Sequence, residues 1–141
     1  MNEKLCTCKS KKKYSDCCEK YHLGKSNCEN AQDLMRSRFS AYALTLVDYI
    51  IKTSHPENIC FQKDLKTLKK DIKSFCEETL FENLEILDFT QEKKQAFVTF
   101  IATLKANGKD ISFTEISHFE KIAGKWLYKG GQLFEGSRKD L

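Results

Sequence analysis

The sequence predicts an α+β fold in which N-terminal helices pack against one face of a bent, antiparallel, four-stranded sheet. Apolar residues recur at helical spacing in the first half of the chain and at strand spacing in the second half. Four cysteines within the first eighteen residues add a small N-terminal zinc knuckle. We therefore divide the chain of 141 residues into a zinc-binding module over 1–28 and an α+β domain over 29–141.

The N-terminal cysteines have the spacing of a zinc site. Cys6 and Cys8 form one close pair, and Cys17 and Cys18 form another. Zn²⁺ takes four ligands in a tetrahedron, and two pairs of thiolates joined by a loop can supply all four. The segment has little apolar surface to bury, so the metal would provide its folding energy. Disulfide pairing, or four reduced thiols without metal, is the alternative that the sequence leaves open.

Two further residues are candidates for the fourth metal ligand. His22 lies one turn beyond Cys18 if that segment is helical, so it could replace this cysteine, although a solvent-facing histidine is the simpler interpretation. Cys28 is the other reserve ligand. A shell of four thiolates leaves no open position for water, so we expect a structural metal site and not a catalytic one.

The first long helix is predicted to run from residue 31 to about Leu46. Asn30 is a good N-cap, and Asp33 favours the positive end of the helix dipole. The apolar stripe that would face the core consists of Met35, Phe39, Tyr42 and Leu46. Two further helices are predicted over 47–52 and 65–77, so helices fill the first half of the chain.

The second half of the chain alternates between inward and outward positions, which predicts strands. The expected strands cover 84–89, 96–104, a stretch that begins at Ile111, and 125–129. Asn107 and Gly108 form a hairpin turn because both tolerate a positive φ. Ile116 has the opposite parity to the start of its strand, which predicts a bulge there and hence a bend.

The N-terminal segment resembles the SEC-C zinc module, because Ser10 and Tyr14 stand between the two cysteine pairs. The segments 34–42, 48–49 and 53–56 are similar to the bacterial YchJ family. This resemblance covers nearly the whole chain. It implies a SEC-C module joined to a domain with the nuclear transport factor 2-like fold, a family to which no biochemical activity is firmly attached.

Two residues of the knuckle depart from that family. Thr7 and Lys9 stand where the family usually has proline and glycine, although all four cysteine positions are kept. The backbone of the knuckle is therefore expected to differ, while its ligand set is retained.

The resemblance also implies a cone that encloses a pocket. Arg38 flanks the apolar stripe of the first helix, and a buried guanidinium needs an acidic or carbonyl partner. Glu115 is either a general base tuned by burial or by Arg38, or an ion-pair partner that closes the cone. His55 is the third pocket candidate, with capping of a helix end as its alternative. His118 stands where the family usually has arginine, so we assign it no role, and we name no catalytic residue.

Charge and composition limit the partners. The net charge of +4 lies entirely on residues 1–28, and the thiolates of a zinc site would reduce it. Nucleic-acid binding is therefore only weakly favoured, and the lysines either keep the module soluble or contact an acidic or phosphate-bearing partner. No apolar run reaches membrane-spanning length, and no apolar signal region is apparent, so we expect a cytoplasmic protein.

Two functions fit the sequence. The first is a zinc-binding protein whose module docks a protein partner and whose cone binds a partner or small ligand. The alternative is an enzyme with a pocket inside the cone that uses Arg38, Glu115 and, as a third candidate, His55. The two differ in whether Arg38 and Glu115 face an open cavity or each other.

Overall fold

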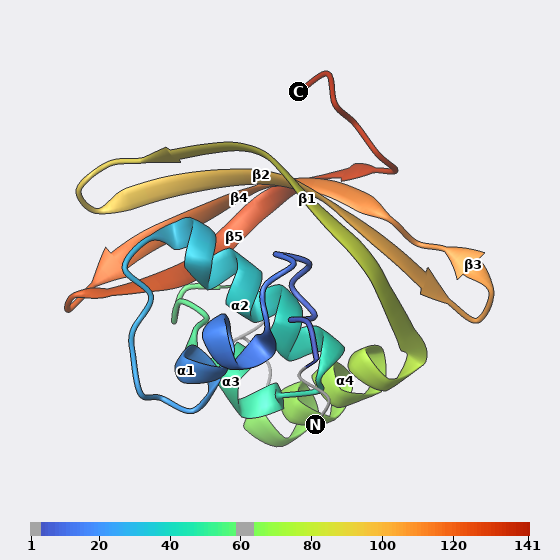
Figure 1. Cartoon of the computed structure of the whole chain (residues 1–141), viewed down its shortest axis with the longest axis horizontal. Helices are drawn as coiled ribbons and strands as arrows, with labels where there is room; N and C mark the ends of the chain where they lie inside the picture. Colours follow the sequence, from blue (N-terminus) through green and yellow to red (C-terminus); the bar gives the residue numbers. More distant parts are fainter. Residues whose placement is uncertain (1–3, 59–63) are drawn as a thin grey trace.

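The computed structural model describes residues 4–58 and 64–141, and in it the helices precede the strands (Figure 1). The helical elements are η1 (Tyr14–Asp16), α1 (Glu19–His22), α2 (Ala31–Ala43), α3 (Val47–Lys52) and α4 (Leu65–Glu78). The strands are β1 (Thr79–Gln91), β2 (Gln95–Ala106), β3 (Lys109–Asp110), β4 (Phe113–Ile122) and β5 (Lys125–Glu135). Within the described part of the chain, no helix is both long enough and apolar enough to cross a membrane.

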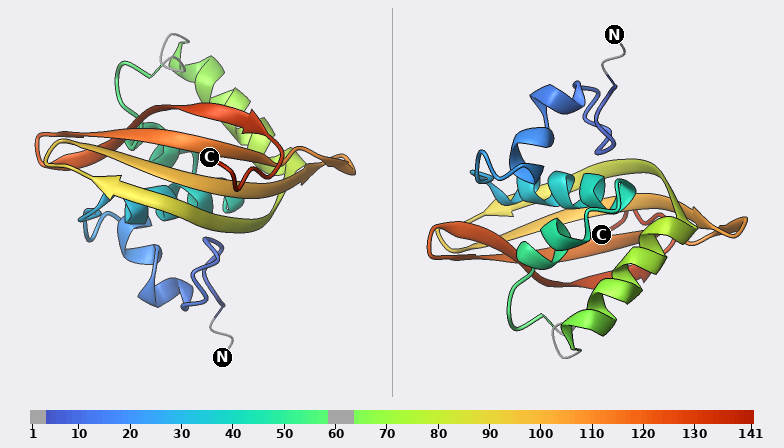
Figure 2. Two further views of the ribbon diagram at one scale, coloured as in Figure 1. Left: turned by 90° about the horizontal axis from the view of Figure 1, so that it is seen from above. Right: turned by 90° about the horizontal axis from the view of Figure 1, so that it is seen from below.

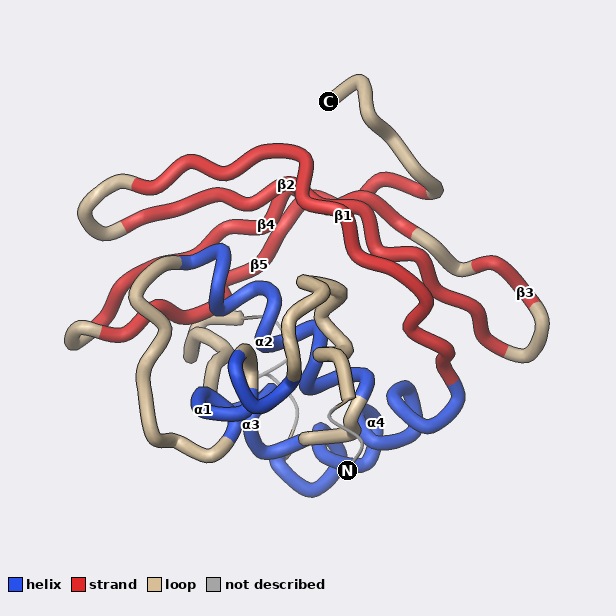
Figure 3. The backbone as a smooth tube through the Cα atoms, viewed as in Figure 1, coloured by secondary structure: helices blue, strands red, loops and turns tan. Residues whose placement is uncertain are grey.

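The strands form one antiparallel sheet that arches over the helices (Figure 3). The strand order is β1-β2-β4-β5, and the short β3 pairs with β2. The helices cover the concave face of this sheet (Figure 1). The α+β fold predicted from the sequence is therefore confirmed, with β3 added to the four expected strands.

Local signals in the sequence explain where α2 begins. The side chain of Asn30 accepts a hydrogen bond of 2.8 Å from the backbone N–H of Asp33, as expected of an N-cap. The helix ends at Ala43 and not at Leu46, because Thr45 adopts a positive φ of 58° that no helical residue can take.

Two tight turns join the long strands. Asn107 and Gly108 have φ values of 53° and 77°, and Ala123 and Gly124 have φ values of 51° and 80°. Positive φ at both central residues is the requirement of a type I′ turn, whose twist matches the flanking strands. The hairpin predicted at Asn107 is confirmed.

The predicted bulge in the third long strand is wrong. β4 pairs with β2 without interruption from Phe113 to Glu120, so Ile116 simply lies on the outer face of a regular strand. The register shifts fall on the outer strands instead. On β5 the shift leaves Lys129 without a partner, and β1 has two shifts. The bend of the sheet therefore originates in its outer strands.

The core lies between α2 and the sheet. Its buried cluster includes Leu34, Met35 and Phe39 of α2, packed against apolar residues of β2, β4 and β5. A second stripe of α2, formed by the small residues Ser37 and Ser40, is also fully buried. In both views of Figure 2, α2 lies between the N-terminal module and α4. The helix is thus covered on more than one face.

Candidate functional site

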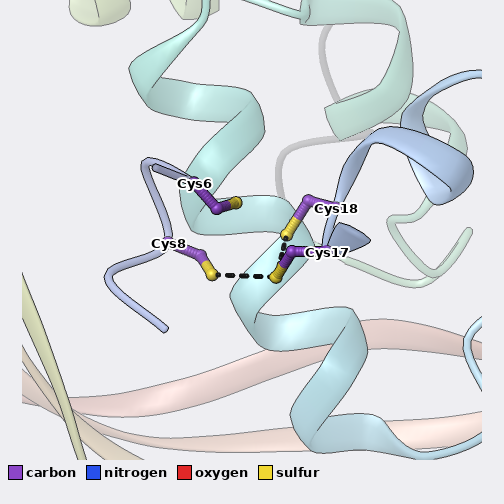
Figure 4. A group of neighbouring side chains, drawn as sticks. All are labelled: Cys6, Cys8, Cys17 and Cys18. Atoms are coloured by element: carbon purple, nitrogen blue, oxygen red, sulfur yellow. Dashed lines mark hydrogen bonds between the residues drawn. The ribbon is translucent and has the colours of Figure 1, made fainter. Parts of the chain in front are cut away.

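The four N-terminal cysteines converge on one point. Their sulfur atoms all lie within 4.8 Å of one another. The Sγ atoms of Cys8 and Cys17 are 3.6 Å apart, and those of Cys17 and Cys18 are 3.9 Å apart (Figure 4). These separations are far longer than a disulfide bond of about 2.05 Å, and all four residues are free thiols.

This arrangement suits a tetrahedral metal ion. Sulfur ligands at about 2.3 Å from zinc are separated by about 3.8 Å from one another, which is close to the observed spacing. Burial and, to a smaller extent, the neighbouring charge of Cys8 raise the pKa of Cys17 to about 11, against the opposing effect of the hydrogen bond from Ser10. Several thiolates this close together need a cation to offset their charge. The Ser10 hydroxyl lies 3.2 Å from the Cys17 sulfur, where it can orient that ligand.

The two reserve ligands lie outside this cluster. Nε2 of His22 donates to the carbonyl of Ser37 at 2.8 Å, and its Nδ1 accepts from the hydroxyl of Tyr14 at 2.6 Å. Neither nitrogen is left for a metal, and burial lowers the pKa of His22, which favours the neutral ring. Cys28 contacts Ser37 and Tyr49 instead of the other cysteines. Neither residue therefore replaces Cys18.

The knuckle is attached to α2. The hydroxyls of Thr7 and Ser40 are 2.6 Å apart, and Nη1 of Arg36 donates to the carbonyl of Cys8 at 3.1 Å. His22 adds its bond to Ser37 one turn away. The loop that carries the first cysteine pair is therefore fixed to one side of α2. The division of the chain at residue 28 stays a prediction.

A large cavity lies between α2, α4 and the concave face of the sheet. Its volume is about 780 Å³. Most of its wall is aromatic or aliphatic, and the aromatic members are Phe39, Tyr42, Phe75, Phe81, Phe100, Phe113, Phe119, Tyr128 and Phe134. Arg38 and Glu115 also line it, and both are buried. The residues of α2 that line the cavity are on a different face from those that hold the knuckle.

Arg38 is held by the end of α3. Its Nη1 donates to the carbonyl of Ile50 at 2.9 Å and to the hydroxyls of Thr53 and Ser54 at 2.7 and 3.1 Å. The guanidinium carbon lies 4.6 Å from the ring centroid of Tyr128, in a cation–π contact. Among the described residues, Nε and Nη2 of Arg38 have no hydrogen-bond partner, and no carboxylate pairs with it.

Glu115 projects from β4 into the same cavity. Its Oε2 accepts a hydrogen bond of 2.8 Å from the hydroxyl of Tyr128. Burial raises the pKa of Glu115, although the bond from Tyr128 and the charge of Arg38 oppose this shift. A Cβ at Gly131 would lie 2.6 Å from Oε2, so a side chain at this position would displace the carboxyl group. The direct ion pair with Arg38 that the sequence suggested is wrong, because Tyr128 lies between the two groups.

The two other histidines lie away from the cavity. Nδ1 of His55 accepts from the backbone N–H of Glu57 at 2.9 Å, so Nε2 carries the proton and donates to Glu120 at 3.1 Å. His55 is buried beside β5 and does not line the cavity, so its placement in the pocket was wrong. His118 stacks on Phe97, with ring centroids 4.7 Å apart, on the outer face of the sheet.

Sequence reasoning missed the part that Tyr128 takes in this site. Tyr128 was only one residue of the expected strand 125–129 and was given no role. An inward-facing tyrosine is a weak signal, because its hydroxyl usually finds some hydrogen-bond partner. The pairing of β4 with β5 is what brings it to Glu115.

A family model described as "YchJ, middle NTF2-like domain" matches residues 30–131. A UPF0225 protein of Enterobacter sp. (strain 638) is 34% identical over 96% of this chain and 88% of its own length. Another from Actinobacillus succinogenes is 37% identical over 88% of this chain and 79% of its own length.

Two solved structures are similar along most of the chain. A SEC-C motif containing protein from Rhodopseudomonas palustris, solved in solution, has 32% identity and a TM-score of 0.81, covering 92% of this chain and 98% of that one. The crystal structure of a sec-c motif containing protein from Psychrobacter arcticus has 26% identity and a TM-score of 0.75, covering 96% of this chain and 85% of that one.

Proposed function

We propose that this chain, which belongs to the YchJ (UPF0225) family, is a zinc-stabilised protein whose cone domain binds a small, largely aromatic molecule. The cavity under α2 is the observation that carries this proposal. Ligand sites are typically apolar hollows of about 300–1,000 Å³ with a few placed polar groups, and this cavity has those properties. Arg38, Glu115 and Ser117 are buried polar residues on its wall, and the half-buried Tyr128 contacts the first two.

Zinc is the metal that the thiol cluster would take. Cys6, Cys8, Cys17 and Cys18 would hold the ion, which supplies charge neutralisation and folding energy to a loop without a core of its own. Through Thr7 and Arg36 the folded loop holds α2 in place. The metal is thus structural, and it acts on the same helix that lines the cavity.

Docking of a partner protein on the module stays a proposal supported by its charge. Lys11, Lys12 and Lys13 are exposed on the loop between the cysteine pairs. An acidic surface or a phosphate group is the kind of partner that these lysines fit. Nucleic acid is the less favoured candidate, because the thiolates of a metal site offset part of the positive charge.

An enzyme is the second candidate function. Glu115 supports it, because a buried carboxyl with a raised pKa on a cavity wall is a group suited to general acid–base chemistry. Ligand binding is favoured because, in the described part of the chain, no histidine lines the cavity.

A fluorescent probe tests the ligand site. Phenylnaphthylamine is apolar, uncharged and bright only in a dry site, so titration of the protein with it should give saturable fluorescence. Ala102 is buried and lines the cavity, so Ala102→Phe should fill part of it and weaken binding by about tenfold or more. Thr103→Phe, one residue along the same strand and on the opposite face, is the control that should bind as the parent does. Absence of saturable binding, or equal binding by both variants, would refute a site in the cavity.

A further inference from the structure

We infer that the cavity selects organic anions, with Arg38 binding the negatively charged group of a ligand whose apolar body fills the aromatic part. This inference rests on the proposed ligand site and names the class of molecule that it takes. A carboxylate, sulfonate or phosphate group on a largely aromatic body has the required chemistry.

The guanidinium of Arg38 is only partly used by the protein. The three hydrogen bonds that it donates all come from Nη1. Nε and Nη2 find no partner among the described residues, yet neither is fully enclosed by protein. Since the residue lines the cavity and is only 7% exposed, the space that these donors can reach is the cavity. Two N–H groups on one side of a guanidinium are the arrangement that binds an oxyanion in a bidentate manner.

The balance of buried charges on the cavity wall also favours an anionic ligand. A buried cation is normally paired, because an unpaired one strongly destabilises the fold. The buried acid on this wall, Glu115, forms no ion pair with Arg38 and is bonded to Tyr128 instead. Burial raises the pKa of Glu115, so its charge compensates Arg38 less than an ordinary carboxylate would. An incoming anion would complete the pairing that the protein leaves open.

Tyr128 fixes the direction in which Arg38 presents its donors. The ring lies against the guanidinium at 4.6 Å, and the hydroxyl is fixed by its 2.8 Å bond to Glu115. Three hydrogen bonds from Nη1 to the end of α3 hold the guanidinium in addition. The guanidinium is thus oriented before a ligand arrives, which reduces the entropy that binding costs.

A cationic ligand is the alternative to an anionic one for this cavity. Asp71, Asp110 and Glu135 also line the cavity, but all three side chains are exposed to solvent. Exposed charges are screened and attract weakly, whereas Arg38 is buried beside low-dielectric surface. The buried cation should therefore determine the preference, and a probe of each kind can decide between them.

The test uses two probes with one skeleton. Phenylnaphthylamine and its sulfonated form, anilinonaphthalene sulfonate, differ in one anionic group. We expect the wild-type protein to bind the sulfonate with a dissociation constant lower by about tenfold or more. Equal affinity, or tighter binding of the uncharged probe, would overturn the inference while leaving the ligand site intact. If neither probe binds, the ligand site and the inference both fail.

Variants test whether Arg38 causes the preference for the sulfonated probe. Arg38→Met should weaken binding of the sulfonate by about tenfold or more and leave the uncharged probe within about twofold. Lys73→Met is the control, since it removes one positive charge from an exposed residue of α4 that does not line the cavity. Equal losses for both probes in Arg38→Met, or a similar loss in Lys73→Met, would contradict the assignment. The wild-type comparison needs no variant, so the inference stays testable if Arg38→Met does not fold.

Discussion

The hydroxyl of Tyr128 donates a hydrogen bond of 2.8 Å to Oε2 of Glu115, while the ring of the same tyrosine lies against the guanidinium of Arg38. Tyr128 thus lies between the buried carboxyl group of Glu115 and the buried guanidinium of Arg38. An ion pair would have closed the cone, whereas this arrangement leaves donors of Arg38 free to face a cavity of about 780 Å³. The inferred preference for anions depends on this relationship.

Removal of the hydroxyl group of Tyr128 should measurably lower the stability of the protein. Tyr128→Phe is expected to lower the free energy of unfolding by about 1–3 kcal/mol, because it leaves a buried carboxyl oxygen without its donor. In a Glu115→Leu background the same change should cost little or nothing, since the hydroxyl no longer has an acceptor there. Urea denaturation of the four proteins gives the coupling energy. Equal losses in both backgrounds would show that the two groups do not interact.

Stability should depend on pH through Glu115. Its pKa lies above the ordinary value of 4.5, so the folded protein keeps this proton to higher pH than the unfolded chain does. The stability contributed by this carboxyl is therefore full below pH 4.5 and falls as the pH rises through the raised pKa.

Glu115→Gln carries a neutral amide at every pH and should not show this fall. The free energy of unfolding of the parent minus that of the variant should thus be largest near about pH 4 and should decrease toward about pH 8. Urea denaturation at a series of pH values measures it. A difference that is constant, or that grows with pH, would mean that the carboxyl is ionised throughout.

Glycine should stabilise the knuckle at two positions. Lys9 and Lys11 have φ values of 67° and 72°, in the left-handed region where a residue with a Cβ loses about 1–2 kcal/mol. Lys9→Gly and Lys11→Gly should therefore each raise the melting temperature of the metal-loaded protein. Lys12 has no positive φ, so Lys12→Gly should lower it. Three equal shifts would mean that lost charge, and not backbone conformation, governs the response.

Metal removal should destabilise the whole chain, because the knuckle bonds to α2. A chelator is expected to lower the melting temperature by about 5 °C or more, and Cys8→Ser should melt low whether or not the chelator is present. Cys76→Ser, a change of a buried thiol outside the cluster, should keep the response to the chelator. Elemental analysis of the same samples should show one zinc ion per chain. A metal-free parent with the same melting temperature would contradict a structural metal site.

Local chemistry was predictable from the sequence. Asn30 caps its helix, Asn107 and Gly108 make their turn, and the cysteine pairs meet, because each depends on residues close together in the chain. The apolar periodicity predicted the α+β class, and the family resemblance implied the nuclear transport factor 2-like fold. Arg38 and Glu115 both line the cavity; the periodicity of one helix pointed to Arg38, and the family resemblance pointed to Glu115.

Most of the predictions that were missing or wrong concern contacts between segments far apart in the chain. The bond from Tyr128 to Glu115 is set by how β5 pairs with β4, and His55 is drawn away from the cavity by Glu120 of β4. The bulge at Ile116 was predicted wrongly because an apolar residue on the outer face of a strand looks like a change of parity. Ser37 and Ser40 were given no role from the sequence, although they are the small residues against which the N-terminal module packs.

The position of a bound ligand tests the central claim most directly. Met35 lines the cavity, is buried, and is the only methionine besides Met1, so its labelled methyl group gives one well-separated NMR signal. With phenylnaphthylamine bound, nuclear Overhauser contacts should appear between the aromatic protons of the probe and the methyl group of Met35. A saturated complex in which the Met35 methyl signal neither shifts nor shows such contacts would place the ligand elsewhere and contradict the account.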